Sequence, residues 1–268
     1  MLRTLLPSVL IIGALLLSAC SAAPTASTAT AVPATPTPVP LLPTATATKA
    51  TPTASPSPTE PAQYLGSLSD AQREALAADA QTYISPYPEE ALATVKRMNF
   101  TVVAGYATAE AVCGPLSLAL LQNAGIVSKD FKLIDFWYLN PRPQHGEKFL
   151  QSVFPAEKFE KIEQVLPLNE VDYSANPLYP GDFLYLFAGD SGSFEHMLVV
   201  TRVDEEGRAY TVTNINTSYG MVIIEVMLYD PAQPGVGQFY EWTNRENAAL
   251  GRTGYGGFWL WRPLTATP

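Results

Sequence analysis

The chain has 268 residues, with 25 acidic and 16 basic side chains and a formal net charge of −9. This acidic balance excludes nucleic acid and anionic lipid head groups as electrostatically favoured partners. Two cysteines and two histidines are too few for an ordinary zinc site unless carboxylates join them, so no metal or other cofactor is implied.

Residues 1–20 have the features of an export signal. Arg3 supplies a positive charge, and residues 5–17 form an apolar run that is too short for a membrane-spanning helix. The run ends in Leu-Ser-Ala-Cys, which resembles the processing site of bacterial lipoproteins. That resemblance implies that Cys20 is lipidated and anchors an extracytoplasmic protein to the cell membrane. The alternative is ordinary cleavage after Ala19, which would release a secreted protein.

Residues 21–63 are rich in Pro, Thr and Ala and contain no aromatic residue. Such a segment buries too little apolar surface to offset its ordering entropy, so we predict a disordered stalk. Residues 64–268 are long enough for one globular domain with its own core, and we expect a monomer.

The domain has helical patterns first and strand patterns after them, an order that predicts an α+β fold. A Ser67-x-x-Asp70 capping pattern begins the first helix, Pro88 begins the second, and Gly125 ends the third. The expected helices cover residues 67–83, 88–98, 115–125, 129–140 and 156–165. The expected strands cover residues 182–189, 196–203, 209–216, 221–229 and 256–263 and form one antiparallel sheet.

The candidate nucleophile is Cys113, in the stretch Ala-Glu-Ala-Val-Cys-Gly-Pro-Leu. Pro115 disfavours helical geometry at Gly114, so the helix is expected to begin at Pro115 with Cys113 just ahead of it. The unpaired N–H groups and the dipole of a helix N-terminus lower the pKa of a thiol there. The alternative is that Cys113 is a small apolar residue of the core.

The candidate general base is His196, because it begins an apolar strand and can face a cleft there. His145 lies in a Pro-rich stretch and is expected to be a solvated surface residue. If Asp204 pairs with Arg208 across a tight turn, His196 lies opposite Asn216, with Asn214 on the same face. An Asn side chain could orient the imidazole, or both Asn residues could simply end the strand.

The Cys-Gly-Pro-Leu segment resembles the nucleophile helix of double-glycine-type peptidases. The segment from Pro180-Gly181-Asp182 to Asn216 is similar to CHAP amidohydrolase/peptidase domains and to cell-wall endopeptidases of the NlpC type. The resemblance implies a papain-like fold in which the nucleophile helix packs on the antiparallel sheet. By position it makes Cys113 the nucleophile, His196 the general base and Asn214 the orienting residue, with Asn216 supporting it or binding the oxyanion.

The chain departs from this pattern at the oxyanion donor. Many papain-like peptidases have Gln a few residues before the nucleophile, but here Tyr106 and Thr108 are the candidates for that role. Asp182 is expected to be a turn residue.

The function predicted from these features is an extracytoplasmic, lipid-anchored thiol hydrolase that cleaves amide bonds in cell-wall peptides or other extracellular peptides. The alternative is a papain-fold binding module on the cell surface without turnover. A solute-binding lipoprotein is less favoured, because the domain does not suggest two lobes.

Overall fold

The computed structural model describes residues 64–99, 112–137, 139–190, 195–244 and 252–264, all within one compact unit that spans Pro56–Pro268. The predictions for residues 1–63, including the signal segment, the lipidation of Cys20 and the stalk, lie outside the described residues. None of the helices in the described part of the chain is both long and apolar enough to cross a bilayer.

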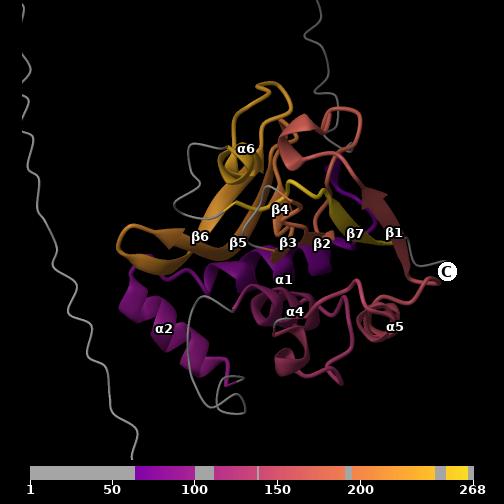
Figure 1. Ribbon diagram of the computed structural model, residues 1–268. Helices are drawn as coiled ribbons and strands as arrows, with labels where there is room; N and C mark the ends of the chain where they lie inside the picture. The colour runs from indigo at the N-terminus through magenta and orange to yellow at the C-terminus, as the bar shows by residue number, and fades with distance from the viewer. Residues whose placement is uncertain (1–63, 100–111, 138, 191–194, 245–251, 265–268) are drawn as a thin grey trace, which may run out of the picture. The chain divides into compact units, whose positions relative to one another are not determined.

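The fold combines helices with antiparallel strands, as the α+β prediction required (Figure 1). The helices are α1 (Asp70–Gln81), α2 (Pro88–Arg97), α4 (Cys113–Asn123), α5 (Gln144–Val153) and α6 (Gln238–Thr243), with the 3₁₀ helices η3 (Leu133–Phe136) and η4 (Leu168–Glu170). The strands are β1 (Phe159–Gln164), β2 (Phe183–Leu186), β3 (His196–Val199), β4 (Arg202–Val203), β5 (Ala209–Thr217), β6 (Gly220–Tyr229) and β7 (Phe258–Pro263).

The strands form two sheets, so the prediction of one sheet is wrong. One sheet has the strand order β1-β7-β2-β3, and the other has the order β4-β5-β6. The chain leaves β3 after Val199 and begins β4 at Arg202, and this break separates the two sheets. They still meet there, because the Thr211 hydroxyl donates to the Val199 carbonyl at 2.7 Å.

Alternate residues of β2 and β3 face two different cores, as the two-residue period of a strand requires. The α4-side core contains Leu116 and Leu120 of α4 with Phe183, Tyr185, Met197, Val199, Val212 and Ile223. The α6-side core contains Phe239 of α6 with Leu184, Leu186, Leu198, Leu228 and Leu260. Figure 1 shows α1, α4 and α5 on one side of these strands and α6 on the other.

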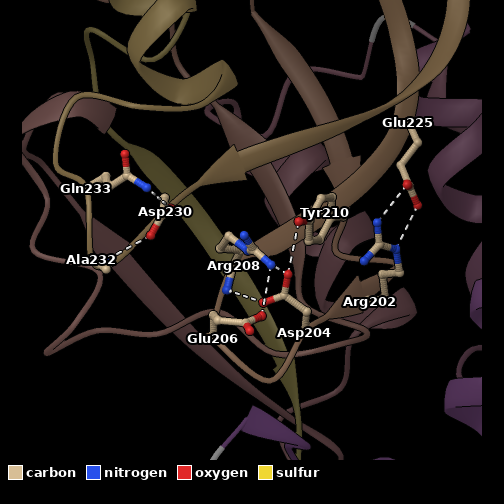
Figure 2. A network of polar contacts seen from close by, with 9 residues as sticks. All are labelled: Arg202, Asp204, Glu206, Arg208, Tyr210, Glu225, Asp230, Ala232 and Gln233. Carbon is tan, nitrogen blue, oxygen red and sulfur yellow. Dashed lines mark hydrogen bonds and ion pairs between the residues drawn. The ribbon is translucent and has the colours of Figure 1, made fainter.

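The turn predicted between Asp204 and Arg208 is confirmed. The Asp204 N–H donates to the Arg208 carbonyl at 3.1 Å, and β4 pairs Arg202 with Tyr210 and Val203 with Ala209. Figure 2 shows why the turn holds: the Arg208 guanidinium and the Tyr210 hydroxyl both donate to the Asp204 carboxylate, at 2.7 and 3.0 Å. This turn fixes the register of β5 against β4.

The predicted helix ends are correct in part. Pro88 begins α2, and Gly125, with φ of 68°, follows the C-cap of α4. The N-cap of α1 is Ser69, which forms a capping box with Gln72. The capping pattern predicted at Ser67 is therefore wrong, because the Ser67 hydroxyl instead donates to the Pro263 carbonyl at 2.5 Å.

Three segments differ from the sequence prediction. Residues 159–164 form β1 and not a helix, because they pair along their whole length with β7, and this pairing outweighs the helix propensity of Glu and Lys. Residues 129–140 contain only the short η3. His145 is exposed as expected, but it lies in α5 and not in a loop.

Asp182 stabilises the fold at the start of β2. Its carboxylate is fully buried and accepts two hydrogen bonds from the Arg262 guanidinium, at 3.0 and 2.7 Å. It also accepts the Tyr179 N–H at 2.9 Å, so it closes the Pro-Gly-Asp turn. Burial raises the pKa of Asp182, and the hydrogen bonds and charge of Arg262 oppose that rise. These contacts make Asp182 structural, as the sequence predicted.

Candidate functional site

Cys113 is the first residue of α4 and is half-buried against the α4-side core. The helix begins two residues earlier than the predicted start at Pro115, because the Leu116 N–H already donates to the Val112 carbonyl at 2.8 Å. The thiol is therefore within the first helical turn, and the unpaired N–H groups of that turn lie around it.

Gly114 lets α4 approach β3 closely. A Cβ atom at this position would lie 2.7 Å from Cε of Met197 and would also overlap the carbonyl oxygen of Phe136. A larger residue would push the helix away from both η3 and β3. Gly114 therefore sets how near Cys113 comes to the beginning of β3.

The thiol environment differs from the one that the sequence predicted. Burial raises the pKa of Cys113, and hydrogen bonds from the backbone of Met197, Gly114 and Cys113 itself oppose that rise without cancelling it. The helix N-terminus thus acts in the expected direction, but desolvation outweighs it. The neutral thiol is the favoured form at neutral pH.

His196 is the first residue of β3 and is also half-buried. Its Nε2 lies 2.8 Å from the Thr213 hydroxyl on β5, and its ring packs edge-on against Trp242 of α6, with ring centroids 5.0 Å apart. Burial lowers the pKa of His196 to about 4, so the imidazole is neutral at pH 7. Thr213 therefore contacts one ring nitrogen, and Trp242 packs against the ring.

Cys113 and His196 both lie at the beginning of β3. The Met197 backbone that contacts Cys113 belongs to the residue directly after His196. By the alternation of β3, the Met197 side chain faces α4 and the His196 side chain begins on the α6 side. The two candidate groups therefore approach the strand end from its two faces.

The register predicted for His196 is wrong. The predicted partners on β5 were Asn214 and Asn216, whereas the residue in contact is Thr213. The Asp204–Arg208 register applies to β4 but not to β3, which lies in the other sheet. Asn214 is buried, and its side-chain amide lies 3.7 Å from Sδ of Met221, while Asn216 is exposed.

The sequence analysis missed a polar cluster beside Cys113. The Tyr185 hydroxyl donates to the Glu195 carboxylate at 2.5 Å, and Arg142 pairs with the same carboxylate at 2.6 Å. Burial is the main cause of the raised pKa of Tyr185; Glu195 and Cys113 raise it further, so its hydroxyl lies within electrostatic reach of the thiol. The alternation of the segment Phe183-Leu184-Tyr185 could have placed Tyr185 on this face.

Tyr106 and Thr108, the candidate oxyanion donors, lie outside the described residues. Within the described part of the chain, no group of three or more His, Cys, Asp or Glu side chains is placed to hold a metal ion. Comparisons of the chain with protein-family models, curated proteins and solved structures gave no match. The chemistry of this site must therefore be argued from its own residues.

Proposed function

We propose that the protein is a thiol hydrolase that cleaves amide bonds, with Cys113 as nucleophile and His196 as general base. The observation that carries this proposal is the contact of Cys113 with the backbone of the residue after His196, at a point where Thr213 holds Nε2 of the imidazole. In the papain-like sites that the sequence resembles, the nucleophilic Cys begins a helix and the His begins a strand, as Cys113 and His196 do here.

Thr213 replaces Asn as the proposed orienting residue. If Nε2–H donates to the Thr213 hydroxyl, Nδ1 carries the lone pair that can accept a proton. Nδ1 is therefore the proposed base. Trp242 packs on the same ring and limits its rotation. Neither Asn214 nor Asn216 is needed for this assignment.

The proposed reaction has two steps. His196 Nδ1 takes the thiol proton while the sulfur attacks the amide carbonyl, and the amine leaves with that proton, so that a thioester forms on Cys113. His196 then takes a proton from water, the hydroxide attacks the thioester, and the carboxylic acid leaves as the thiol regains its proton. The raised pKa of the thiol and the lowered pKa of the imidazole both oppose the first transfer, so the reaction is expected to be faster at alkaline pH, where more of the thiol is ionised.

The proposed substrates are peptides outside the cytoplasm, including the stem peptides of peptidoglycan. The signal segment, the lipidation of Cys20 and the stalk of residues 21–63 support this location as sequence features. The proposed fold is papain-like, because α4 packs on an antiparallel sheet whose strand begins at His196. A stalk would let a membrane-anchored domain reach the wall.

A second candidate function is a cell-surface binding module without turnover. The raised pKa of Cys113 and the lowered pKa of His196 favour it, because both shifts disfavour the thiolate–imidazolium pair that papain-like catalysis uses. In such a module, Tyr185, Glu195 and Arg142 would contact the ligand beside an unreactive thiol.

The deciding experiment is digestion of purified peptidoglycan and of unfolded peptides by the full chain, with released amines measured by mass spectrometry. The hydrolase predicts release by the parent protein, none above background by Cys113→Ser, and release reduced by about 100-fold or more by His196→Gln. A matched control is His145→Gln, which changes the exposed histidine of α5 and should release amines at the parental rate. Binding of these substrates without release would support the binding module instead.

A further inference from the structure

A concave feature of the protein lies apart from Cys113. A cavity of about 280 Å³ is enclosed by two segments, residues 168–174 and residues 229–240. The first segment begins with η4, and the second runs from the end of β6 into α6. A volume of this size is just below the usual range for small-molecule sites, so it suits a small ligand.

The cavity has an aromatic wall. The Tyr173 and Tyr229 rings stack with centroids 4.1 Å apart, and the Phe239 ring lies 5.5 Å from Tyr173. Tyr240 and Val236 stand at the rim, 39% and 43% exposed, respectively. A partly exposed tyrosine ring and an exposed apolar side chain at one opening favour a ligand with an apolar or cationic surface.

The charges of the lining residues are of one sign. Glu170, Asp172 and Asp230 contribute carboxylates, and none of the described residues that line the cavity is Lys, Arg or His. Hydrogen bonds from the side chain and backbone of Ser174 lower the pKa of Asp172, which keeps it ionised. Figure 2 shows Asp230 held by the Ala232 N–H and the Gln233 amide, at 2.9 and 3.0 Å.

Tyr173 adds a buried polar group to this wall. It is 7% exposed, and its hydroxyl has no hydrogen-bond partner among the described residues. A buried hydroxyl without a partner costs free energy that a polar ligand or an ordered water would recover.

We propose that this cavity binds a small organic cation of the size of an arginine side chain. The partly exposed ring of Tyr240 can attract a cation, and the carboxylates of the lining add a favourable field. A planar guanidinium suits this site in particular, because it stacks on tyrosine rings and donates to carboxylates at the same time. The site is separate from the proposed hydrolase chemistry and does not depend on it.

Trp242 of helix α6 provides a fluorescence reporter for binding in the cavity. Phe239 and Tyr240 of α6 line the cavity, and Trp242 of the same helix packs on His196. A cation bound against α6 changes the surroundings of the Trp242 indole, and tryptophan emission reports such a change. The Trp242→Phe variant identifies the share of the signal that comes from this residue.

The test is calorimetric titration of the full chain with n-butylguanidinium and with its neutral isostere n-butylurea. We expect a dissociation constant of about 1 mM for the guanidinium and binding of the urea weaker by about tenfold or more. Added salt should weaken the guanidinium alone. Equal binding of the two probes, or no binding of either, would overturn the proposal.

Substitutions in the cavity test whether n-butylguanidinium binds there. Glu170→Gln and Tyr240→Ala should each weaken n-butylguanidinium by about two- to fivefold, and the exposed Glu157→Gln, which lies outside the cavity, should leave it unchanged. If the cavity variants bind as tightly as Glu157→Gln, the cation sits elsewhere and the proposal fails. Cys113→Ser should bind like the parent, so failure of the hydrolase and failure of this site are separate results.

Discussion

The Thr213 hydroxyl lies 2.8 Å from Nε2 of His196, and this contact joins β3 of the four-stranded sheet to β5 of the three-stranded sheet. Thr213 is 1% exposed, so its hydroxyl is shielded from water. The contact fixes which nitrogen of His196 remains available, and the proposed chemistry depends on that choice.

Removing this hydroxyl should therefore lower the activity that depends on His196 more than it lowers the stability of the fold. We expect Thr213→Val to lower amide hydrolysis by about tenfold or more and to cost about 1 to 2 kcal/mol of stability. Thr213→Ser keeps the hydroxyl and should retain most activity. The check is kcat/KM with urea unfolding of both variants. Equal activity of the Val and Ser variants would remove Thr213 from the mechanism.

The lowered pKa of His196 predicts acid destabilisation. Since its folded pKa is about 4 and its unfolded pKa is about 6.5, the unfolded chain binds the proton more tightly. This contribution to stability is complete above about pH 6.5 and is lost as the pH falls toward 4, to a total of about 3 kcal/mol.

Urea unfolding between pH 7 and pH 4 measures this effect. The His196→Gln variant should lose less stability than the parent over this interval, whereas His145→Gln should follow the parent curve. If His196→Gln loses stability as steeply as the parent does, another group is responsible. A ring-proton titration by NMR gives the pKa of His196 directly.

The raised pKa of Cys113 predicts slow alkylation at neutral pH. The thiolate is the reactive form, so the folded protein should react with iodoacetamide more slowly than the urea-unfolded protein at pH 7.5. The rate should keep increasing as the pH rises above 9. A Cys20→Ala background leaves Cys113 as the single thiol. Faster reaction at pH 6 than that of a free thiol would instead show an activated thiolate.

A Cβ atom at Gly114 should separate α4 from β3. Gly114→Ala would place its methyl group against Met197 and Phe136, and we expect a loss of about 1 to 3 kcal/mol despite the better helix propensity of Ala. Gly125→Ala is the matched control, because its Cβ would meet open space and only its positive φ carries a cost, about 1 kcal/mol. Urea midpoints compare the two. A smaller loss at Gly114 would contradict the close approach.

Local signals in the sequence were sufficient to predict some of the helix starts and turns. Pro88 predicted the start of α2, and Asp204 with Arg208 predicted the turn before β5, because their effects act over a few residues. Residues 159–164 were predicted as a helix because their preference is local, whereas their pairing partner β7 lies about a hundred residues away. The six-residue α6 is too short to show a helical period.

The sequence predicted the two central residues of the candidate site, Cys113 and His196, but not the residues that contact them. Cys113 and His196 could be predicted at the beginning of a helix and of a strand because a helix N-terminus and a strand start are both local features. The partner of His196 required a register across the break between β3 and β4, which no short-range rule gives. Thr213 could not be predicted as this partner, because nothing in its own segment distinguishes its hydroxyl from those of the neighbouring Thr residues of β5.

The hydrogen bond from Ser67 to the carbonyl of Pro263 brings the two ends of the described domain together. A domain whose ends touch tolerates circular permutation when the new ends lie at an exposed turn. The turn between β5 and β6 offers such a point, since Tyr219 is 88% exposed. A chain that is joined from residue 264 back to residue 64 and opened at this turn should therefore keep the same cores. It would turn the tip of the hairpin into an attachment point for labels or fusion partners.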